Sequence, residues 1–388
     1  MTLIVDSVFD LDALLSADEI AWRHKARAFA TERILPIIED DFENKHFRRE
    51  LIPQLAEAGF LGMHITGHGC AGAGPVAYGL VCNELEAADS GWRTFVSVQG
   101  SLAMSAIAKH GSEEQKTAWL PRMAAGEVIG CFALTEPAGG SDPAAMTTRA
   151  VRDGDDWVID GAKRWIGLAS VAHIAIVWAK DDEGVVRGFI VPTESAGFAA
   201  TPIDGKLSMR ASIQCDVRLE GVRVPESARL PEAKGLSAPF ACLNEARYGI
   251  AWGAMGAARS CLEAAIERSR GREVFGAPIG SRQLIQAKLA DMFVEYEKGM
   301  LTALHLGRLK EKGSITPVQI SVGKLNSVRE ALEIAHTSRA ILAGDGITDA
   351  FPVMRHAANL EAVRTYEGTD EIHQLVIGRE LTGIGAFA

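Results

Sequence analysis

The sequence is short of the features that mark a metal, disulfide or membrane protein. Its 388 residues include six cysteines without a C-x-x-C pair, which argues against zinc and thioredoxin-type sites and favours free thiols in a reducing compartment. The longest apolar run, residues 171–179, contains a histidine and is less than half of the roughly twenty residues that a membrane span needs. Residues 1–15 contain no basic residue, unlike a targeting peptide. We therefore expect a cytoplasmic protein with no membrane partner.

Positive charge is also scarce. The 40 lysines and arginines are outnumbered by 50 acidic residues, and the net charge of −10 argues against a nucleic-acid partner. A phosphorylated small ligand stays possible, because a single arginine or a helix N-terminus can hold phosphate on an acidic protein. The composition, 47% hydrophobic and 23% charged, is that of an ordinary globular protein. The length exceeds what one hydrophobic core usually covers, so we expect two or three domains.

The hydrophobic period divides the chain into three parts. Residues 1–126 show helical spacing, beginning after the potential cap Ser16. Residues 127–236 carry short alternating runs rich in Val, Ile and Thr between turn residues, which is typical of an antiparallel β-barrel or sandwich. Residues 237–388 return to long amphipathic helices with short loops. The predicted fold class is α+β, with an N-terminal helical domain, a central antiparallel β domain and a C-terminal four-helix bundle.

Residues 67–72 spell G-x-G-x-x-G, a pattern that binds dinucleotides in some folds. That fingerprint needs a preceding strand, a helix that opens on its third glycine, and repeated βαβ units. Here helical patterns precede the glycines, and no β/α alternation follows. We interpret the segment as a loop and not as a nicotinamide site.

The most informative segment is residues 365–372. It places Glu367 at a break between two helical patterns, followed by Gly368 and the potential helix cap Thr369. A carboxylate at such a corner can enter a cavity while its backbone N–H stays available. This combination suits proton abstraction next to a carbonyl, with a base for the proton and an amide donor for the oxygen. An ordinary helix-end acid followed by an ordinary cap is the alternative that the local pattern leaves open.

Arg93 stands against local preference. Asp89 or Ser90 can cap a helix, which places Arg93 in the first turn, where a cation opposes the helix dipole. Ser97 lies on the same face one turn later. A residue placed against its local preference suggests a bound anion. A side chain that extends to solvent is the alternative.

Three other segments could contact a ligand. The loop 134–142 contains small residues and the hydroxyls of Thr135 and Ser141, which would allow close approach to a flat or phosphorylated ligand, or it is a plain connection. Trp165, near Gly167, could wall an aromatic cofactor or fill the β core. Arg272 could clamp a phosphate, although most such arginines are solvated surface charges.

Taken together, six segments resemble the acyl-CoA dehydrogenase family, most closely the members that act on glutaryl-CoA. They are residues 84–97, 131–142, 240–252, 272–276, 283–292 and 365–372, and the resemblance extends over residues 10–387. It implies a helix–β–helix arrangement, a homotetramer and FAD as cofactor. It also implies an acyl-CoA substrate and an electron-transfer flavoprotein as partner.

The resemblance further implies that Glu367 is the base that removes the α-proton of the acyl thioester, while the β-hydrogen leaves as hydride to the flavin. Some relatives carry the base immediately before the arginine that matches Arg247. Ala246 stands there and cannot take a proton, which leaves Glu367. Arg93 resembles the arginine that pairs with the distal carboxylate of glutaryl-CoA. Because a buried cation without an anion is costly, we expect the substrate to supply the negative charge.

The site residues implied by the resemblance form two sets, and no metal ligand is among them. The substrate-binding set is Arg93, Thr94, Ser97, Glu86, Ser141, Phe240, Leu243, Asn244, Arg247, Tyr366 and Gly368. The flavin-binding set, contributed partly across a subunit boundary, is Phe132, Leu134, Thr135, Gly140, Ser141, Trp165, Ile166, Gly167, Arg272, Phe275, Gln283, Ala340, Leu342, Gly344, Thr369 and Glu371. The chain departs from the family at Gly167, where threonine is common, and at Ala340, where a polar side chain is frequent.

The implied reaction is the α,β-dehydrogenation of glutaryl-CoA with decarboxylation to crotonyl-CoA and CO2, and electrons pass to the electron-transfer flavoprotein. A non-decarboxylating or short-chain acyl-CoA dehydrogenase or oxidase is the alternative among enzymes. A non-catalytic acyl-CoA-binding protein is the alternative outside enzymes. The joint presence of Glu367, Arg272 and Arg93 favours an enzyme.

Overall fold

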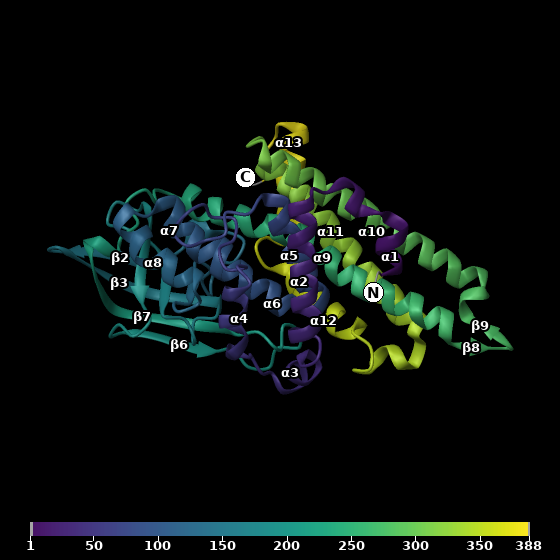
Figure 1. The fold of residues 1–388 in the computed structure, drawn as a ribbon. Helices are drawn as coiled ribbons and strands as arrows, with labels where there is room; N and C mark the ends of the chain where they lie inside the picture. Colours follow the sequence, from purple (N-terminus) through teal and green to yellow (C-terminus); the bar gives the residue numbers. More distant parts are fainter. Residues whose placement is uncertain (1–2, 387–388) are drawn as a thin grey trace.

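The computed structural model describes residues 3–386 and shows the helix–β–helix arrangement that the sequence predicts (Figure 1). The N-terminal part contains α1 (Ile4–Phe9), α2 (Ala17–Phe29), α3 (Ile38–Asn44), α4 (Ile52–Glu57), α5 (Pro75–Ala88), α6 (Ser90–Val96), α7 (Ser105–His110) and α8 (Glu113–Ala124). Two of these helices begin at capping boxes, Ser16 with Glu19 and Ser112 with Gln115, so the local sequence fixes their starts. Residues 67–72 lie in the loop between α4 and α5, as predicted.

A continuous helical segment runs from α6 through the π-helical turn η4 (Ser97–Met104) into α7. Asp89 caps its start, because its carboxylate accepts a hydrogen bond of 2.7 Å from the N–H of Gly91. The same carboxylate accepts hydrogen bonds from Arg355 and Asn359 of the C-terminal part. The helical segment that carries Arg93 is therefore held at its start by Asp89, and one turn after Arg93 its backbone changes from α-helix to the wider π-helix. π-helical turns are frequent at functional sites.

The central part is one seven-stranded sheet. Its strands are β1 (Gly130–Ala133), β2 (Arg149–Asp153), β3 (Asp156–Gly167), β4 (Ile174–Lys180), β5 (Val186–Pro192), β6 (Phe198–Pro202) and β7 (Gln214–Pro225). The strand order is β1-β4-β2-β3-β7-β6, and β5 pairs with β4. Most pairs are antiparallel, as predicted, but β4 pairs in parallel with β1 and, at one residue pair, with β2. The β2–β3 hairpin separates these two strands in the chain, so β4 begins again at the end of the sheet where β1 begins.

The C-terminal part consists of long helices. They are α9 (Ser237–Gly271), α10 (Gln283–Glu311), α11 (Pro317–Leu342), α12 (Val353–Thr365) and α13 (Asp370–Thr382), with the short hairpin β8 (Glu273–Val274) and β9 (Ala277–Pro278) between α9 and α10. The hairpin lies at one end of the molecule and the large sheet lies at the other (Figure 1). Within residues 3–386, no helix combines the length and the apolar composition that a bilayer crossing demands.

Glycines on α9 let it approach α5 closely. A Cβ on Gly256 would lie 1.9 Å from the backbone oxygen of Asn83, and a Cβ on Gly253 would lie 2.0 Å from Oε2 of Glu86. Neither distance leaves room for a larger side chain. This contact sets where the carboxylates of α5 lie relative to the bundle.

Glu84 of α5 anchors a buried ionic cluster that joins the N-terminal segment to the bundle. Its carboxylate accepts hydrogen bonds from Arg27 at 2.7 Å and from Arg259 at 2.6 Å, and Arg23 lies 3.3 Å away. Asp6 of α1 pairs with Arg23 and Arg27, each at 2.6 Å. The guanidinium groups hold the pKa of Glu84 well below its usual range, although burial opposes this shift.

Removal of the Glu84 charge should destabilise the protein. We expect Glu84→Gln to lower the free energy of unfolding by about 3–5 kcal/mol, because Arg259 is then buried without an anion. Urea denaturation followed by circular dichroism measures this. Glu113→Gln, which breaks an exposed pair with Lys116, is the matched control and should leave the midpoint unchanged. Equal midpoints for the two variants would show that the cluster does not stabilise the fold.

Candidate active site

Glu367 lies at a sharp break between two helices. α12 ends at Thr365 and α13 begins at Asp370, with Thr369 as its N-cap, as the sequence predicts. Glu367 has a φ of 56° and Gly368 a φ of 102°, so both occupy the left-handed region. For glutamate this conformation is strained and persists only where the surroundings enforce it. A Cβ on Gly368 would lie 2.9 Å from Nε2 of His373, which explains the glycine.

Cationic side chains hold the backbone of this break. Nζ of Lys324, on α11, donates to the carbonyl oxygens of Tyr366 and Gly368, each at 2.6 Å. Nε of Arg247, on α9, donates to the carbonyl oxygen of Glu367 at 2.7 Å. The N–H of Glu367 donates to no group among residues 3–386. The turn therefore directs its carbonyls toward the bundle and leaves the amide of Glu367 available to a ligand.

The Glu367 carboxyl group has the environment of a general base. Its Oε2 is shielded from solvent and has no hydrogen-bond partner among the described residues. Burial raises the pKa of Glu367, and the positive charges of Arg93, Lys324 and Arg247 oppose the rise. A carboxylate with an unused oxygen and a raised pKa is suited to accept a proton from a bound molecule.

Arg93 is completely buried and lies beside this base. Its Nε donates to Oε2 of Glu86 at 2.6 Å, and its Nη2 donates to the hydroxyl of Tyr366. The Tyr366 hydroxyl also lies 3.2 Å from the Thr94 hydroxyl. The substrate is therefore not the sole source of negative charge for Arg93, because Glu86, on the preceding helix, already supplies an anion.

Polar groups without a hydrogen-bond partner nevertheless remain around Arg93. Nη1 of Arg93, Oε1 of Glu86 and the hydroxyl of Ser97 are buried without a hydrogen-bond partner among residues 3–386. Burial raises the pKa of Glu86, although Arg93 opposes the rise. Buried polar groups are rarely left unpaired in a finished fold, so this cluster has the composition of a site for a polar group of a ligand.

The predicted substrate residues of α9 share one face of the helix. Phe240, Leu243, Asn244 and Arg247 follow the i, i+3, i+4, i+7 spacing, and all four are half-buried, whereas Ala246 is buried. Arg247 of this row touches the Glu367 carbonyl. The structure thus places an open face of α9 next to the base.

The predicted flavin residues of the sheet surround the ends of β1 and β3. Phe132 and Leu134 are buried, and Gly140 and Ser141 are exposed in the following loop. Ile166 is buried and Thr135 is half-buried. The alternative that Trp165 fills the β core is wrong, because its side chain is 53% exposed on a left-handed backbone with a φ of 63°. A Cβ on Gly167 would lie 3.5 Å from Val98 of η4, so the end of β3 adjoins the segment that carries Arg93.

The other predicted flavin residues lie elsewhere in the chain. Arg272, Phe275 and Gln283 surround the β8–β9 hairpin, at the end of the molecule opposite the sheet, and all are exposed (Figure 1). The exposed Ala340 lies in the last turn of α11 and the exposed Gly344 in the segment after it, which the Arg268–Asp345 ion pair joins to the same end of α9. Thr369 and the exposed Glu371 lie at the start of α13. The Leu342 side chain is fully buried, so this residue could contact a ligand only through its backbone.

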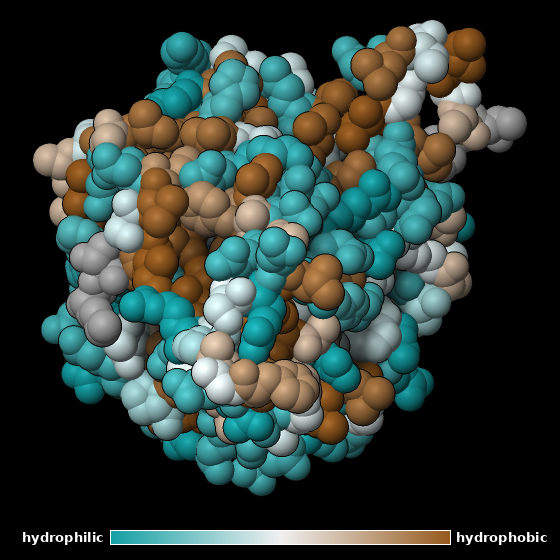
Figure 2. Space-filling model, turned by 90° about the vertical axis from the view of Figure 1, so that its right-hand side faces the viewer, coloured by the Kyte–Doolittle hydropathy of each residue, from teal (hydrophilic) through white to brown (hydrophobic). Residues whose placement is uncertain are grey.

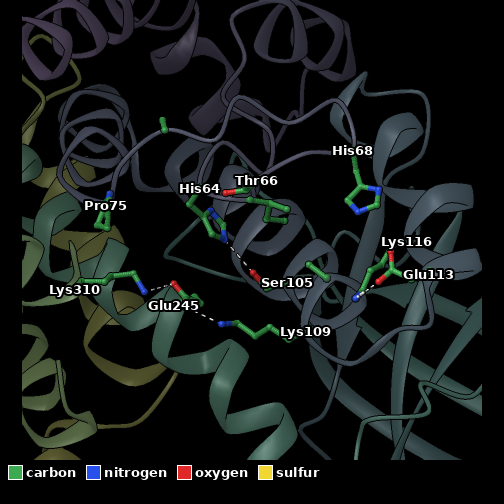
Figure 3. A pocket seen from close by; sticks show the side chains of 13 residues that line it. His64, Thr66, His68, Pro75, Ser105, Lys109, Glu113, Lys116, Glu245 and Lys310 are labelled. Carbon is green, nitrogen blue, oxygen red and sulfur yellow. Dashed lines mark hydrogen bonds and ion pairs between the residues drawn. The ribbon is translucent and has the colours of Figure 1, made fainter. Parts of the chain in front are cut away.

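A separate cavity of about 470 Å³ opens beside Glu245 of α9 (Figure 3). Its wall includes His64, Lys109, Glu245 and Lys310. Glu245 pairs with Lys310 at 2.7 Å and with Lys109 at 3.0 Å, and these lysines lower its pKa to about 2 against the effect of burial. Burial lowers the pKa of His64 to about 4, so its ring is neutral near pH 7. The cavity has no contact with Glu367, and its glutamate is already neutralised.

Sequence reasoning missed Lys324 and His373. Lys324 is 1% exposed and occupies the apolar stripe of α11 with Ile320 and Val328. A lone lysine at that spacing was the available signal, because lysine is almost never fully buried unless it is paired. His373, 1% exposed, packs against Gly368, and nothing in its sequence context marks it.

Comparisons with known proteins agree with this geometry. The chain matches the acyl-CoA dehydrogenase N-terminal domain over residues 16–127, the middle domain over 131–222 and the C-terminal domain over 233–382. The human mitochondrial short-chain specific acyl-CoA dehydrogenase is 33% identical over 361 residues, 92% of this chain and 88% of that protein.

Two solved structures are closer in sequence than this relative. A glutaryl-CoA dehydrogenase from Mycobacterium smegmatis is 57% identical, with a TM-score of 0.98 over 99% of both chains. A glutaryl-CoA dehydrogenase from the same organism in complex with FADH2 is 54% identical, with a TM-score of 0.98 over 100% of both chains. A chain from a study of the electron transferring flavoprotein of Acidaminococcus fermentans is 30% identical, with a TM-score of 0.91 over 95% of this chain and 98% of that one. The protein therefore belongs to the acyl-CoA dehydrogenase family.

Proposed function

We propose that the protein oxidises glutaryl-CoA between its α and β carbons and decarboxylates the product to crotonyl-CoA and CO2. The observation that carries the proposal is Arg93, a fully buried guanidinium that lies beside the Glu367 base and has one unpartnered nitrogen. An apolar acyl chain has no use for a buried cation with spare donors. The higher identity to the glutaryl-CoA dehydrogenase structures, 57% and 54%, than to the human short-chain enzyme, 33%, supports the same substrate.

The residues present fit a bound FAD. Trp165 exposes a flat aromatic face, and a Cβ on Gly140 would meet nothing within 4 Å, so the β-domain loops leave room for a ring system. Thr135, Ser141 and the backbone of Ile166 and Gly167 would hold the flavin on this side. When bound, FAD supplies the acceptor for the hydride equivalent that leaves the β-carbon.

The residues of the chain itself supply acid–base chemistry and orientation. Glu367 accepts the α-proton, and its backbone N–H donates to the thioester oxygen, where negative charge develops. Loss of CO2 from the distal end of the unsaturated thioester leaves an electron pair that spreads to the same oxygen. The N–H that stabilised the first anion thus stabilises the second, and one proton returned to the carbon chain gives crotonyl-CoA.

Arg93 orients the distal carboxylate. A second anion beside Glu86 would leave the buried cluster with net negative charge, which is costly. Because burial already raises the pKa of Glu86, this carboxyl group can take a proton as the substrate binds, which frees the guanidinium. The electrons are then passed to an electron-transfer flavoprotein, a partner that the family resemblance supports.

A short-chain acyl-CoA dehydrogenase is the second candidate. The observation in its favour is the Arg93–Glu86 pair at 2.6 Å, because a neutral pair can line a pocket for an uncharged acyl chain. The same pair is therefore compatible with both substrates. The protonation state of Glu86 determines whether the pocket accepts a charged or an uncharged acyl end.

We further propose a homotetramer in which the flavin site is completed by a second subunit. The predicted flavin residues of the sheet and those of the β8–β9 hairpin lie at opposite ends of one chain, so a single subunit cannot bring them together (Figure 1). The hairpin end carries apolar patches among hydrophilic surface (Figure 2). Phe275 is 96% exposed and Leu284 is 80% exposed, an unusual exposure for large apolar side chains unless another chain covers them.

Product analysis tests the proposed reaction. Under anaerobic conditions with an artificial electron acceptor, the holoenzyme should convert glutaryl-CoA to crotonyl-CoA with one CO2 per turnover. Glu367→Gln should lower kcat by about 10²- to 10⁴-fold, because it removes the general base, while Glu361→Gln, an exposed carboxylate of α12, should not. Glutaconyl-CoA without CO2 would refute decarboxylation, and full activity in Glu367→Gln would refute the base.

Substitution of Arg93 tests the substrate. We expect Arg93→Met to lower kcat/KM for glutaryl-CoA by about 30- to 1,000-fold, which corresponds to about 2–4 kcal/mol for a buried charge pair. The kcat/KM for butyryl-CoA should fall much less. The double variant Arg93→Met/Glu86→Gln keeps the pocket neutral and separates loss of folding from loss of recognition. An equal loss for both substrates in the double variant would contradict the role of Arg93.

Light scattering coupled to size exclusion tests the assembly. We expect four subunits per particle, and Phe275→Glu should reduce both the particle mass and the FAD content, because one surface serves assembly and cofactor binding. Leu207→Glu, which changes an exposed leucine outside the hairpin end, is the matched control and should change neither. A monomer that keeps stoichiometric FAD would contradict the shared site.

A further inference from the structure

Lys324 is buried in the N-terminal half of α11, and within residues 3–386 its hydrogen-bond partners include no carboxylate. Both of its hydrogen bonds, each 2.6 Å long, go to backbone carbonyls, those of Tyr366 and Gly368. These carbonyls flank Glu367 on either side. A buried ammonium is costly to keep, so a lysine that serves only two carbonyls needs a reason beyond packing.

The contact to Tyr366 acts on the reacting amide. The carbonyl of Tyr366 and the N–H of Glu367 belong to one peptide group, so a hydrogen bond donated to the oxygen draws electron density away from the N–H. Hydrogen bonds in such chains strengthen one another, and a charged donor has more effect than a neutral one. The amide that meets the thioester oxygen is therefore a stronger donor than an ordinary backbone N–H.

The contact to Gly368 fixes the Gly368–Thr369 peptide group, at the far side of the same turn. With Arg247 on the Glu367 carbonyl, each carbonyl from Tyr366 to Gly368 has a cationic donor. The planes of the peptide groups on both sides of Glu367 are thus set by α9 and α11 together. Preorganised donors of this kind need no rearrangement when charge develops on a bound carbonyl.

We propose that Lys324 is a positioning residue that holds and polarises the Tyr366–Glu367 peptide group, so that its N–H stabilises the negative oxygen of a bound acyl-CoA thioester. The inference deepens the proposed function and rests on it. It assigns Lys324 no proton transfer and no contact with the substrate.

The charge of Lys324 also acts on the base. Burial lowers the pKa of Lys324 to about 7, and Glu367 and Asp370 favour its charged form while Arg247 and Arg93 oppose it. The positive charge of Lys324 in turn lowers the pKa of Glu367. Removal of that charge should therefore raise the pKa of the base and move the acid limb of the kcat/KM profile to higher pH.

Lys324→Met and Lys324→Gln test the inference in the FAD-loaded enzyme. The first removes the charge and both donors, and the second removes the charge but keeps a shorter amide donor. With crotonyl-CoA carrying a 13C label at the thioester carbonyl, infrared spectroscopy reports the polarisation of the bound carbonyl. We expect its stretching frequency to return toward the value in solution in Lys324→Met and partly in Lys324→Gln. We expect kcat to fall about 10-fold with a smaller change in KM.

Lys298→Met, which removes an exposed lysine of α10, is the matched control and should leave frequency, kcat and pH profile unchanged. A carbonyl frequency and an acid limb equal to those of the wild type, in whichever Lys324 variant folds, would overturn the inference. Such a result leaves the proposed function intact if the wild type still releases crotonyl-CoA and CO2. A wild type that neither binds nor oxidises glutaryl-CoA refutes the proposed function instead.

Discussion

The candidate site depends on the hydrogen bonds that Lys324 and Arg247 donate to the carbonyls of residues 366–368. A glutamate in the left-handed region costs about 1–3 kcal/mol, and the break in the helix leaves its carbonyls without helical partners. Each hydrogen bond from a charged donor contributes about 1.5–3 kcal/mol, so the contacts together outweigh the strain. The strained turn is therefore stable, and its orientation is set by two helices of the bundle.

Helix α9 connects the parts of the site. Gly253 and Gly256 bring it against α5, which fixes Glu86 beside Arg93, while Arg247 holds the turn of the base. The same helix thus positions Glu367, the proposed proton acceptor, and also the Arg93–Glu86 pair, which contacts the hydroxyl end of Tyr366. Because both depend on close helix packing, a shift of α9 would disturb base and arginine together.

Much of the fold could be predicted from sequence, because it follows from local rules. The helical and β-strand spacing of the hydrophobic residues predicts the α+β fold class. The helix cap at Thr369 and the helix break at Glu367 follow from local residue preferences. The parallel β1–β4 pair and the burial of Leu342 depend on contacts between distant segments, which no local pattern encodes. The neutralisation of Arg93 by Glu86 depends on how two helices pack, so the sequence analysis placed both residues in one site but did not predict that they pair.

Substrate choice in this pocket is a matter of charge balance. Arg93 and Glu86 are neutral as a pair, and an uncharged acyl chain leaves them so, whereas a distal carboxylate adds a charge that the apolar surroundings do not tolerate. Only a proton on Glu86 restores the balance, and the raised pKa of Glu86 makes that proton available at modest cost. A dicarboxylic substrate then gains the unpartnered Nη1 of Arg93, a contact that a monocarboxylic thioester cannot make. The proposed specificity for glutaryl-CoA therefore resides in the pair and not in the arginine alone.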